Sequence, residues 1–527
     1  MSNKVLMMAL VLVMVVSVAL FAAEQPQYGG TLFRENNTDW DTLDPAYCSG
    51  FDAGDMAVKI FDGLVRFDYY SNEIRPNLAK NWEVSNNNQT FIFHLRPGVK
   101  FHNGRELTAA DVKYSFDRLY DPATASPGTW VYDMIVGTEQ ALDGKSDGLA
   151  GVQVLDDYTV SFELKYPFGL FLTHLTLPYG LIVPREEVER WGDRFSQNPV
   201  GTGPWKFVEW RHDERLVLEA NEDYWEGRPY LDKVVYRVIP HALTRIAEFE
   251  AGNLDYTAVP QEELKRWTNN PEWQPYLHQM AELSTYYLAL NSDFEPLNQP
   301  RIRKAIALAL DSEQITRALF PQYIPADDAI PAGMPGGLSQ TGPGYDPEKA
   351  KELMAEAGYP DGFAMEIWTS SGEKSVRVGG VLQALLKRVG IEVRLVKNDW
   401  SVFFATVKKG KAPAYYLSWW ADYADPYNFL DALYASEGSR INYKNAIIDK
   451  MLEEMARTTS VEARVEISKK IIEVARQQGD PYVWLFHTSS TTVKQPWIKG
   501  EIHHQMYDAD KLVTWWIDQE IKAELTK

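Results

Sequence analysis

The chain contains 527 residues, of which 24% are charged, and it carries a formal net charge of −20 at pH 7. This acidity argues against nucleic acid and against an anionic membrane surface as partners, because both repel a negatively charged protein. Cys48 is the only cysteine, which excludes an internal disulfide and a cysteine-rich zinc site, so the hydrophobic cores of two or three domains must hold the fold.

The N-terminus has the pattern of an export signal. Residues 5–23 are apolar except for Ser17, follow Lys4 and end in small residues, so we expect a signal peptide at 1–23 and a periplasmic or secreted protein. The apolar run is long for a signal, and Phe21 lies three positions before the expected cut, so an uncleaved membrane anchor is the alternative. No cysteine lies at 20–25, so no lipid anchor is expected.

The next part of the chain predicts a separate α+β subdomain. Strands are expected at 90–95, 152–155 and 159–164 because apolar residues alternate there. A helix begins at Thr108, with Asp111 three residues later as its capping acid.

Two further regions each predict an α/β lobe. Around 233–259 a strand, a helix stopped by Gly252 and a second strand follow one another. Between 364 and 418 strands alternate with helices, as in an open α/β sheet. The apolar segments 286–291 and 482–486 are expected to cross between the lobes and form a hinge, so the cleft between the lobes is the expected ligand site.

These expectations define a bilobal α/β fold with two crossover segments and an inserted α+β subdomain. The predicted division is a signal at 1–23, lobe I at 24–62, 195–285 and 488–527, the inserted subdomain at 63–194, and lobe II at 286–487.

The stretch 418–430, SWWADYADPYNFL, combines aromatic and acidic residues where the last predicted strand of lobe II ends. Aromatic faces hold planar, apolar or cationic groups, and Asp422 or Asp425 can meet an ammonium group or sugar hydroxyls. Aromatic residues near a strand end are also ordinary core residues, and Asp-Pro is an ordinary turn signal. The position at the carboxyl end of a strand favours a binding site, because open α/β sheets bind ligands there.

Motifs of catalysis and energy coupling are missing from the sequence. Glu139 stands where a phosphate-binding loop ending at Gly144-Lys145-Ser146 would need its first glycine. There is no G-x-S-x-G nucleophile motif, and His503 and His504 are adjacent rather than spaced to hold a metal ion. We therefore expect a protein without cofactor, metal or enzymatic activity, and a secreted hydrolase or a surface adhesin are the alternatives of another class.

Several longer stretches resemble one family. The run 77–112, NLAKNWEVSNNNQTFIFHLRPGVKFHNGRELTAADV, is similar to the signature of family 5 extracytoplasmic solute-binding proteins, the oligopeptide and dipeptide receptors of ABC importers. The stretches 43–45 (LDP), 198–207 (NPVGTGPWKF), 297–311 (LNQPRIRKAIALALD) and 419–430 occur in the order that this family shows. The resemblance covers essentially the whole chain after the signal.

The resemblance implies a monomeric receptor that docks on ABC permease subunits. In peptide-binding members the aspartate of a W-x-A-D-Y motif meets the α-ammonium of the ligand, and here this is Asp422, flanked by Trp419 and Tyr423. The family also binds the ligand through backbone groups near the mature N-terminus. These would be Ala46, Tyr47, Cys48, Ser49 and Gly50.

One position departs from the peptide-binding pattern. Tyr416 stands where some oligopeptide-binding members have a basic residue for the ligand carboxylate. The same fold also receives oligosaccharides, and Trp419, Trp420, Tyr423 and Tyr427 could stack on sugar rings. An oligopeptide is the first expectation for the ligand and an oligosaccharide is the second.

Overall fold

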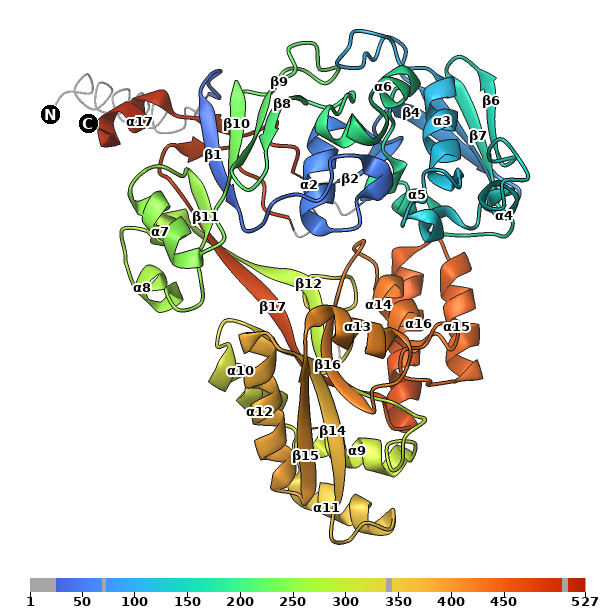
Figure 1. Cartoon of the computed structure of the whole chain (residues 1–527), viewed down its shortest axis with the longest axis vertical. Helices are drawn as coiled ribbons and strands as arrows, with labels where there is room; N and C mark the ends of the chain where they lie inside the picture. The colour runs from blue at the N-terminus through green and yellow to red at the C-terminus, as the bar shows by residue number, and fades with distance from the viewer. Residues whose placement is uncertain (1–24, 69–72, 338–343, 505–509, 527) are drawn as a thin grey trace, which may run out of the picture.

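The computed structural model describes residues 25–68, 73–337, 344–504 and 510–526, so the predicted signal peptide and the alternative N-terminal anchor lie outside the described residues. Two lobes are joined by two long strands, β12 (Leu277–Leu290) and β17 (Tyr482–Lys494) (Figure 1). The predicted bilobal α/β fold is confirmed. In the part of the chain that is described, no helix is long and apolar enough to span a membrane.

Lobe I is built on a four-stranded sheet in the order β1-β10-β9-β8. Leu32, Leu218 and Val234 face one core because apolar residues alternate along these strands. The C-terminal segment returns to this lobe, where the Trp205 indole N–H donates to the Lys511 carbonyl at 2.7 Å. The elements of lobe I are β1 (Thr31–Asn36), the 3-10 helix η1 (Pro45–Tyr47), α2 (Phe51–Ile60), β8 (Trp205–Arg211), β9 (Arg215–Ala220), β10 (Lys233–Val238), α7 (Ala242–Glu250), α8 (Leu264–Thr268), β18 (Ile498–Lys499), β19 (Trp516–Ile517) and α17 (Gln519–Leu525).

The inserted subdomain has an antiparallel sheet in the order β4-β5-β7-β6, and helix α3 packs on it. Phe93, Phe116 and Phe162 meet edge to face in its core. Its elements are β2 (Val65–Asp68), β3 (Glu73–Pro76), β4 (Ala79–Ser85), β5 (Thr90–Leu95), α3 (Ala109–Tyr120), η2 (Thr129–Tyr132), α4 (Thr138–Leu142), β6 (Val152–Asp156), β7 (Thr159–Glu163), α5 (Phe171–His174), η3 (Pro178–Gly180), α6 (Arg185–Trp191) and η4 (Gly192–Gln197).

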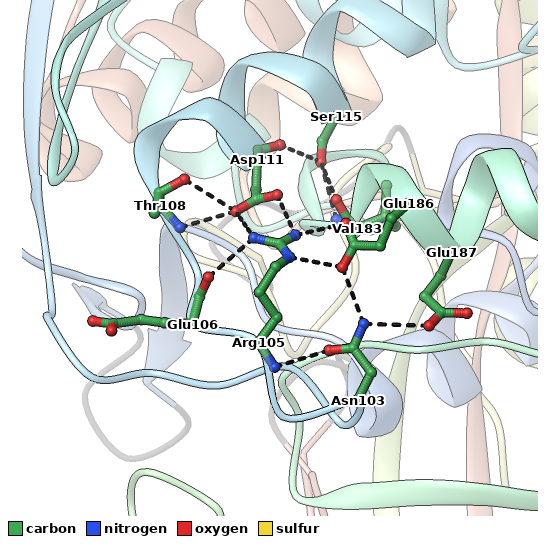
Figure 2. A network of polar contacts seen from close by, with 9 residues as sticks. All are labelled: Asn103, Arg105, Glu106, Thr108, Asp111, Ser115, Val183, Glu186 and Glu187. Atoms are coloured by element: carbon green, nitrogen blue, oxygen red, sulfur yellow. Dashed lines mark hydrogen bonds and ion pairs between the residues drawn. The ribbon is translucent and has the colours of Figure 1, made fainter.

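The charged end of the stretch 77–112 has a structural role. The Arg105 guanidinium donates to both carboxylate oxygens of Asp111, at 2.6 and 3.0 Å, and to Glu186 at 2.7 Å (Figure 2). Asn103 also donates to Glu186, at 3.0 Å, and Asp111 completes the predicted capping box at the start of α3. This network fastens α3 to α6, so these residues hold the subdomain together rather than facing a ligand.

Lobe II contains a seven-stranded sheet in the order β11-β17-β12-β16-β14-β15, with β13 beside β17. The core on one face includes residues of α9, α10, α11 and α12, and the core on the other face includes residues of α13, α14, α15 and α16. The remaining bounds are β11 (Tyr256–Ala258), η5 (Gln274–Tyr276), β13 (Ile324–Pro325), β14 (Phe363–Ser370), β15 (Ile391–Asn398), β16 (Ala414–Trp420), α9 (Pro300–Ala309), α10 (Ser312–Leu319), α11 (Pro347–Glu356), α12 (Glu373–Lys387), α13 (Trp400–Lys408), α14 (Pro426–Tyr434), α15 (Ala446–Arg457) and α16 (Val461–Gln477).

The two crossing strands are longer than the sequence predicted, and they pair with each other. The antiparallel register runs from Leu277 opposite Val493 to Ala289 opposite Tyr482. Sequence reasoning found only 286–291 and 482–486, because the other halves of both strands are rich in polar residues.

The α/β unit predicted at 233–259 is divided between two sheets. β11 was expected to continue the unit begun by β10, but it pairs with β17. The reason is that β10 lies between β1 and β9, so it has no free edge for a further strand.

Candidate functional site

The segment after β16 forms a loop that the side chain of Asn428 closes. The Asn428 amide donates to the Asp422 carboxylate at 2.9 Å. Its carbonyl oxygen accepts from the Asp422 backbone N–H at 3.1 Å and from the Trp419 indole N–H at 3.0 Å. Asn428 lies in the first turn of α14, which Asp425 caps, so the Asp-Pro turn brings this amide to Asp422.

Asp422 is a partly buried carboxylate without a cation. Burial raises the pKa of Asp422, and only the hydrogen bond from Asn428 and its own backbone N–H oppose that shift. Among the described residues, no lysine, arginine or histidine forms an ion pair with it. Removing a charge from water without a partner is unfavourable, so this carboxylate is suited to a cation that comes from outside the chain.

The segment 46–50 presents backbone groups on the lobe I side. The side chains of Ala46 and Cys48 are buried, and the Ala46 carbonyl accepts from Ser126 at 2.5 Å, so these two residues are tied into the lobe. Within the described structure, the N–H groups of Ser49 and Gly50 have no acceptor, and open space adjoins the Cα of Gly50. Tyr47 is 37% exposed. The free donors of this segment therefore lie at its second half.

Tyr179 connects the two sides. Burial raises the pKa of the Tyr179 hydroxyl, and the negative charge of Asp422 acts in the same direction. The 3-10 helix η3, which carries Tyr179, packs against η1 on the lobe I side. The structure brings together two parts of the site that are more than 370 residues apart in the sequence.

Tyr423 is part of the contact between the lobes. Its side chain is 3% exposed and packs in the core of the inserted subdomain, with its ring centre 5.0 Å from that of His174. Beside it the rings of Phe168 and Tyr427 are 6.5 Å apart. In this arrangement of the lobes, the ring of Tyr423 is covered by protein.

The remaining predicted site residues differ in exposure. Trp419 is partly buried, with the Arg440 guanidinium 5.3 Å from its ring, whereas Trp420 is 48% exposed. Tyr416 is 3% exposed and stacks on Tyr286, and its hydroxyl has no hydrogen-bond partner among the described residues. Trp420 is thus the aromatic residue of this set that is most open to a ligand.

Sequence reasoning missed a lysine near Tyr416. Lys374, in the first turn of α12, lies 4.4 Å from the ring centre of Tyr286 and 5.0 Å from that of Tyr323. Burial lowers the pKa of Lys374 to about 8, and the Glu282 carboxylate opposes that shift. Its position in the sequence could have identified it, because α12 starts just after β14 ends. Ligands of open α/β sheets bind at such strand ends.

The arrangement combines groups that can bind a ligand. Its components are a buried carboxylate, backbone donors, an exposed tryptophan and a partly desolvated ammonium. In the described ranges, no group of three or more histidine, cysteine, aspartate or glutamate side chains could hold a metal ion. An uncompensated carboxylate and an ammonium at the same end of the lobe II sheet are complementary to a ligand that carries both charges.

Two lobes joined by crossing strands, with candidate binding groups on each, are typical of solute-binding receptors. A sequence model of bacterial extracellular solute-binding proteins, family 5, matches residues 73–440, and the chain belongs to this family. The chain is 30% identical over 483 residues to heme-binding protein A of Haemophilus influenzae, covering 86% of each chain. It is also 30% identical over 497 residues to the periplasmic oligopeptide-binding protein OppA of Salmonella typhimurium, covering 89% of each.

Solved structures agree with this placement. The periplasmic binding protein DppA from Helicobacter pylori, in complex with the peptide STSA, has a TM-score of 0.78 and 28% identity, covering 94% of this chain and 99% of that one. Haemophilus influenzae OppA, in complex with the peptide RPPGFSPFR, has a TM-score of 0.75 and 26% identity, covering 94% and 100%.

Proposed function

We propose that this chain is a non-enzymatic receptor that binds an oligopeptide between its lobes. The observation that carries the proposal is the desolvated Asp422 carboxylate, which lacks a cation from the protein but is held by Asn428. An α-ammonium supplies the missing charge. Two relatives support a peptide ligand, because they are named as peptide-binding or were solved with a peptide.

The backbone of the ligand is expected to pair with lobe I. The unpartnered N–H groups of Ser49 and Gly50 can donate to peptide carbonyls. Such backbone contacts give affinity without reading side chains, so a receptor of this kind accepts many sequences.

We assign the carboxylate end of a short peptide to Lys374. Tyr416 cannot supply a positive charge, but Lys374 lies over the ring of Tyr286, on which Tyr416 stacks. A pKa near 8 keeps the ammonium protonated at neutral pH, and an incoming carboxylate stabilises the charged form further.

The place and partner of the protein follow from the same proposal. An exported receptor works in the periplasm or outside the cell and delivers its ligand to the permease subunits of an ABC importer, acting as a monomer. An exclusively oligosaccharide-binding receptor is the alternative, in which Trp420 would stack on a sugar ring and Asp422 would accept from hydroxyls.

The first test is a thermodynamic cycle that combines a substitution at Asp422 with acetylation of the peptide N-terminus. Peptides with free and with acetylated N-termini are titrated by calorimetry into the parent protein and into Asp422→Asn. Loss of one member of a buried charged pair costs about 2–5 kcal/mol, so we expect a weakening by a few tens to a few thousand times from either change. The two losses should not add, because acetylation removes a charge whose partner is already neutral.

Controls separate charge from damage to the fold. Asp431→Asn neutralises another buried carboxyl on α14, which bonds to Tyr427, and should leave the difference between free and acetylated peptides intact. Lys374→Met should remove the preference for a peptide acid over the corresponding amide. If acetylated peptides bind the parent protein as well as free ones, the amine anchor is wrong. Mass spectrometry of ligands released from the purified protein then tests the oligosaccharide alternative directly.

A further inference from the structure

A separate cavity of about 660 Å³ lies in lobe II. Its walls come from α9, the start of α10, α11, the end of α16 and the first residues of β17. The volume is in the range of small-molecule sites, which is about 300–1,000 Å³. Its apolar and aromatic lining includes Leu308, Leu310, Leu353, Tyr482, Val483 and Trp484.

This cavity lies at the opposite end of the sheet from Asp422. Tyr482 is level with Tyr415 across β12, because both pair with Ala289. Asp422 lies seven residues further along the chain from Tyr415, which corresponds to about 20 Å in an extended strand. A ligand in this cavity would therefore not touch the amine anchor of the proposed peptide site.

The cavity wall contains a carboxylate that only neutral groups hold. Asp480 accepts from the Tyr434 hydroxyl at 3.0 Å, from the Trp484 indole N–H at 3.1 Å and from the Tyr482 backbone N–H at 3.0 Å. Burial raises the pKa of Asp480 to about 6, and Arg476 is the weakest of the influences that oppose this shift. These donors fix the orientation of the carboxylate without neutralising it.

The cations of the same wall are directed to other acceptors. Arg303 donates to four backbone carbonyls, those of Leu297, Asn298, Gln478 and Gly479, at 2.6 to 3.2 Å. Lys304 donates to the Gln477 carbonyl at 2.8 Å.

The other two cations of the wall also have partners. Lys349 donates to Glu352 at 2.8 Å, and Arg476 donates to the Asp327 carbonyl at 2.8 Å. By contrast, the carboxylates of Asp311, Asp327 and Asp480 form no ion pair within the described residues. Carboxylates without a cationic partner are therefore available to a ligand on this wall.

We propose that this cavity binds a small organic cation, an ammonium group on an apolar or aromatic body, with Asp480 as its charge partner. The apolar body would fill the space beside Leu353 and Trp484, while Tyr434 and Trp484 keep the carboxylate aimed at the ammonium. Aromatic rings on the wall also favour a cation over an anion, because their faces are negative.

The test uses three probes of one shape: 2-phenylethylammonium, 2-phenylethanol and 3-phenylpropionate. They are titrated into full-length Asp422→Asn protein, so that the amine anchor of the peptide site cannot bind the probe. The ammonium should bind about thirtyfold or more tightly than the alcohol, and the propionate should bind least. Affinity for the ammonium should fall below pH about 6, where Asp480 takes up a proton.

Two variants locate the probe. Asp480→Asn should abolish the preference for the ammonium over the alcohol, and Leu353→Trp should fill the cavity and abolish binding of both. Each change, made also in the parent protein, should leave peptide affinity unchanged, which shows that the variant is folded and separates this site from the peptide site. The proposal is overturned if the three probes bind alike, or if either variant binds the ammonium as the reference protein does.

Discussion

Asp422 and Asp425 are three residues apart in one motif, and their surroundings differ. Asp425 forms a buried ion pair with Arg464 at 2.6 Å. Arg464 also donates to the carbonyls of Thr458 and Thr459, in the turn between α15 and α16. Asp422 has no such partner and is held by an amide. Burial raises the pKa of both carboxyls, but a guanidinium opposes the shift only at Asp425.

The ion pair of Asp425 has a structural role. This turn and the end of α15 pack against the inserted subdomain, where the Gly169 N–H donates to the Ala456 carbonyl at 2.8 Å. A side chain at Gly169 would collide with Thr458 at 2.4 Å. The aspartate paired with Arg464 therefore supports the contact between the lobes, whereas the uncompensated one is the ligand's charge partner in our proposal.

The largest expected effect is on stability. Asp425→Asn or Arg464→Met strands one member of a buried pair and should lower the free energy of unfolding by about 3–5 kcal/mol. Urea denaturation followed by circular dichroism measures it. Asp422→Asn is the matched control and should be at least as stable as the parent protein, because it removes an uncompensated buried charge.

The double variant Asp425→Leu/Arg464→Met sharpens this comparison. It removes both charges together, so most of the lost stability should return. A double variant as unstable as the sum of the single ones would contradict a role through the ion pair.

An intermediate effect is expected from pH. The pKa of Asp422 is raised above its ordinary value of 3.8, so in the unliganded protein this carboxyl favours folding at low pH. That contribution is lost as pH rises through the native pKa. Peptide binding needs the charged form, so affinity should fall by up to about tenfold for each pH unit below the native pKa. Calorimetry between pH 4 and 7 should show this slope in the parent protein and a flatter profile in Asp422→Asn.

The smallest expected effects are those of replacing Trp419 or Trp420 by phenylalanine. Trp420 is 48% exposed, so Trp420→Phe should change the free energy of unfolding by less than about 0.5 kcal/mol. It should nevertheless remove most of the change in fluorescence on peptide binding. Trp419→Phe deletes the bond to Asn428 and should weaken peptide binding several-fold. Equal fluorescence responses in both variants would mean that neither indole reports the ligand.

Local patterns in the sequence predicted many of the helices and strands of lobe II. The alternation of strands and helices ended at the carboxyl end of β16, and this placed the motif containing Asp422 correctly on its sheet. The crossing strands were found only where they are apolar, and the sheet to which β11 belongs depended on which edges were free. Pairing of that kind is decided by tertiary structure, which a single stretch of sequence does not contain.

The partners of the site residues were the least predictable part. Asn428 lay within the motif, but its role depends on the geometry of the first turn of α14. Lys374 is 48 residues before Asp422, and nothing in its neighbours marks it as a partly buried cation. The interpretation of 46–50 named five residues, and only the fold shows that Ser49 and Gly50 keep free donors.

The pairing of β12 with β17 has a mechanical consequence. A two-stranded ribbon bends across its width more easily than its strands slide past each other, because sliding breaks every ladder hydrogen bond at once. Its register is interrupted between Tyr286 and Tyr287 and, over a longer stretch, between Ala281 and Thr285, where we expect bending to meet least resistance. Glu282 lies within that interruption and acts on the charge of Lys374. The ribbon that joins the lobes therefore carries, at its interruption, an acidic residue whose charge acts on Lys374.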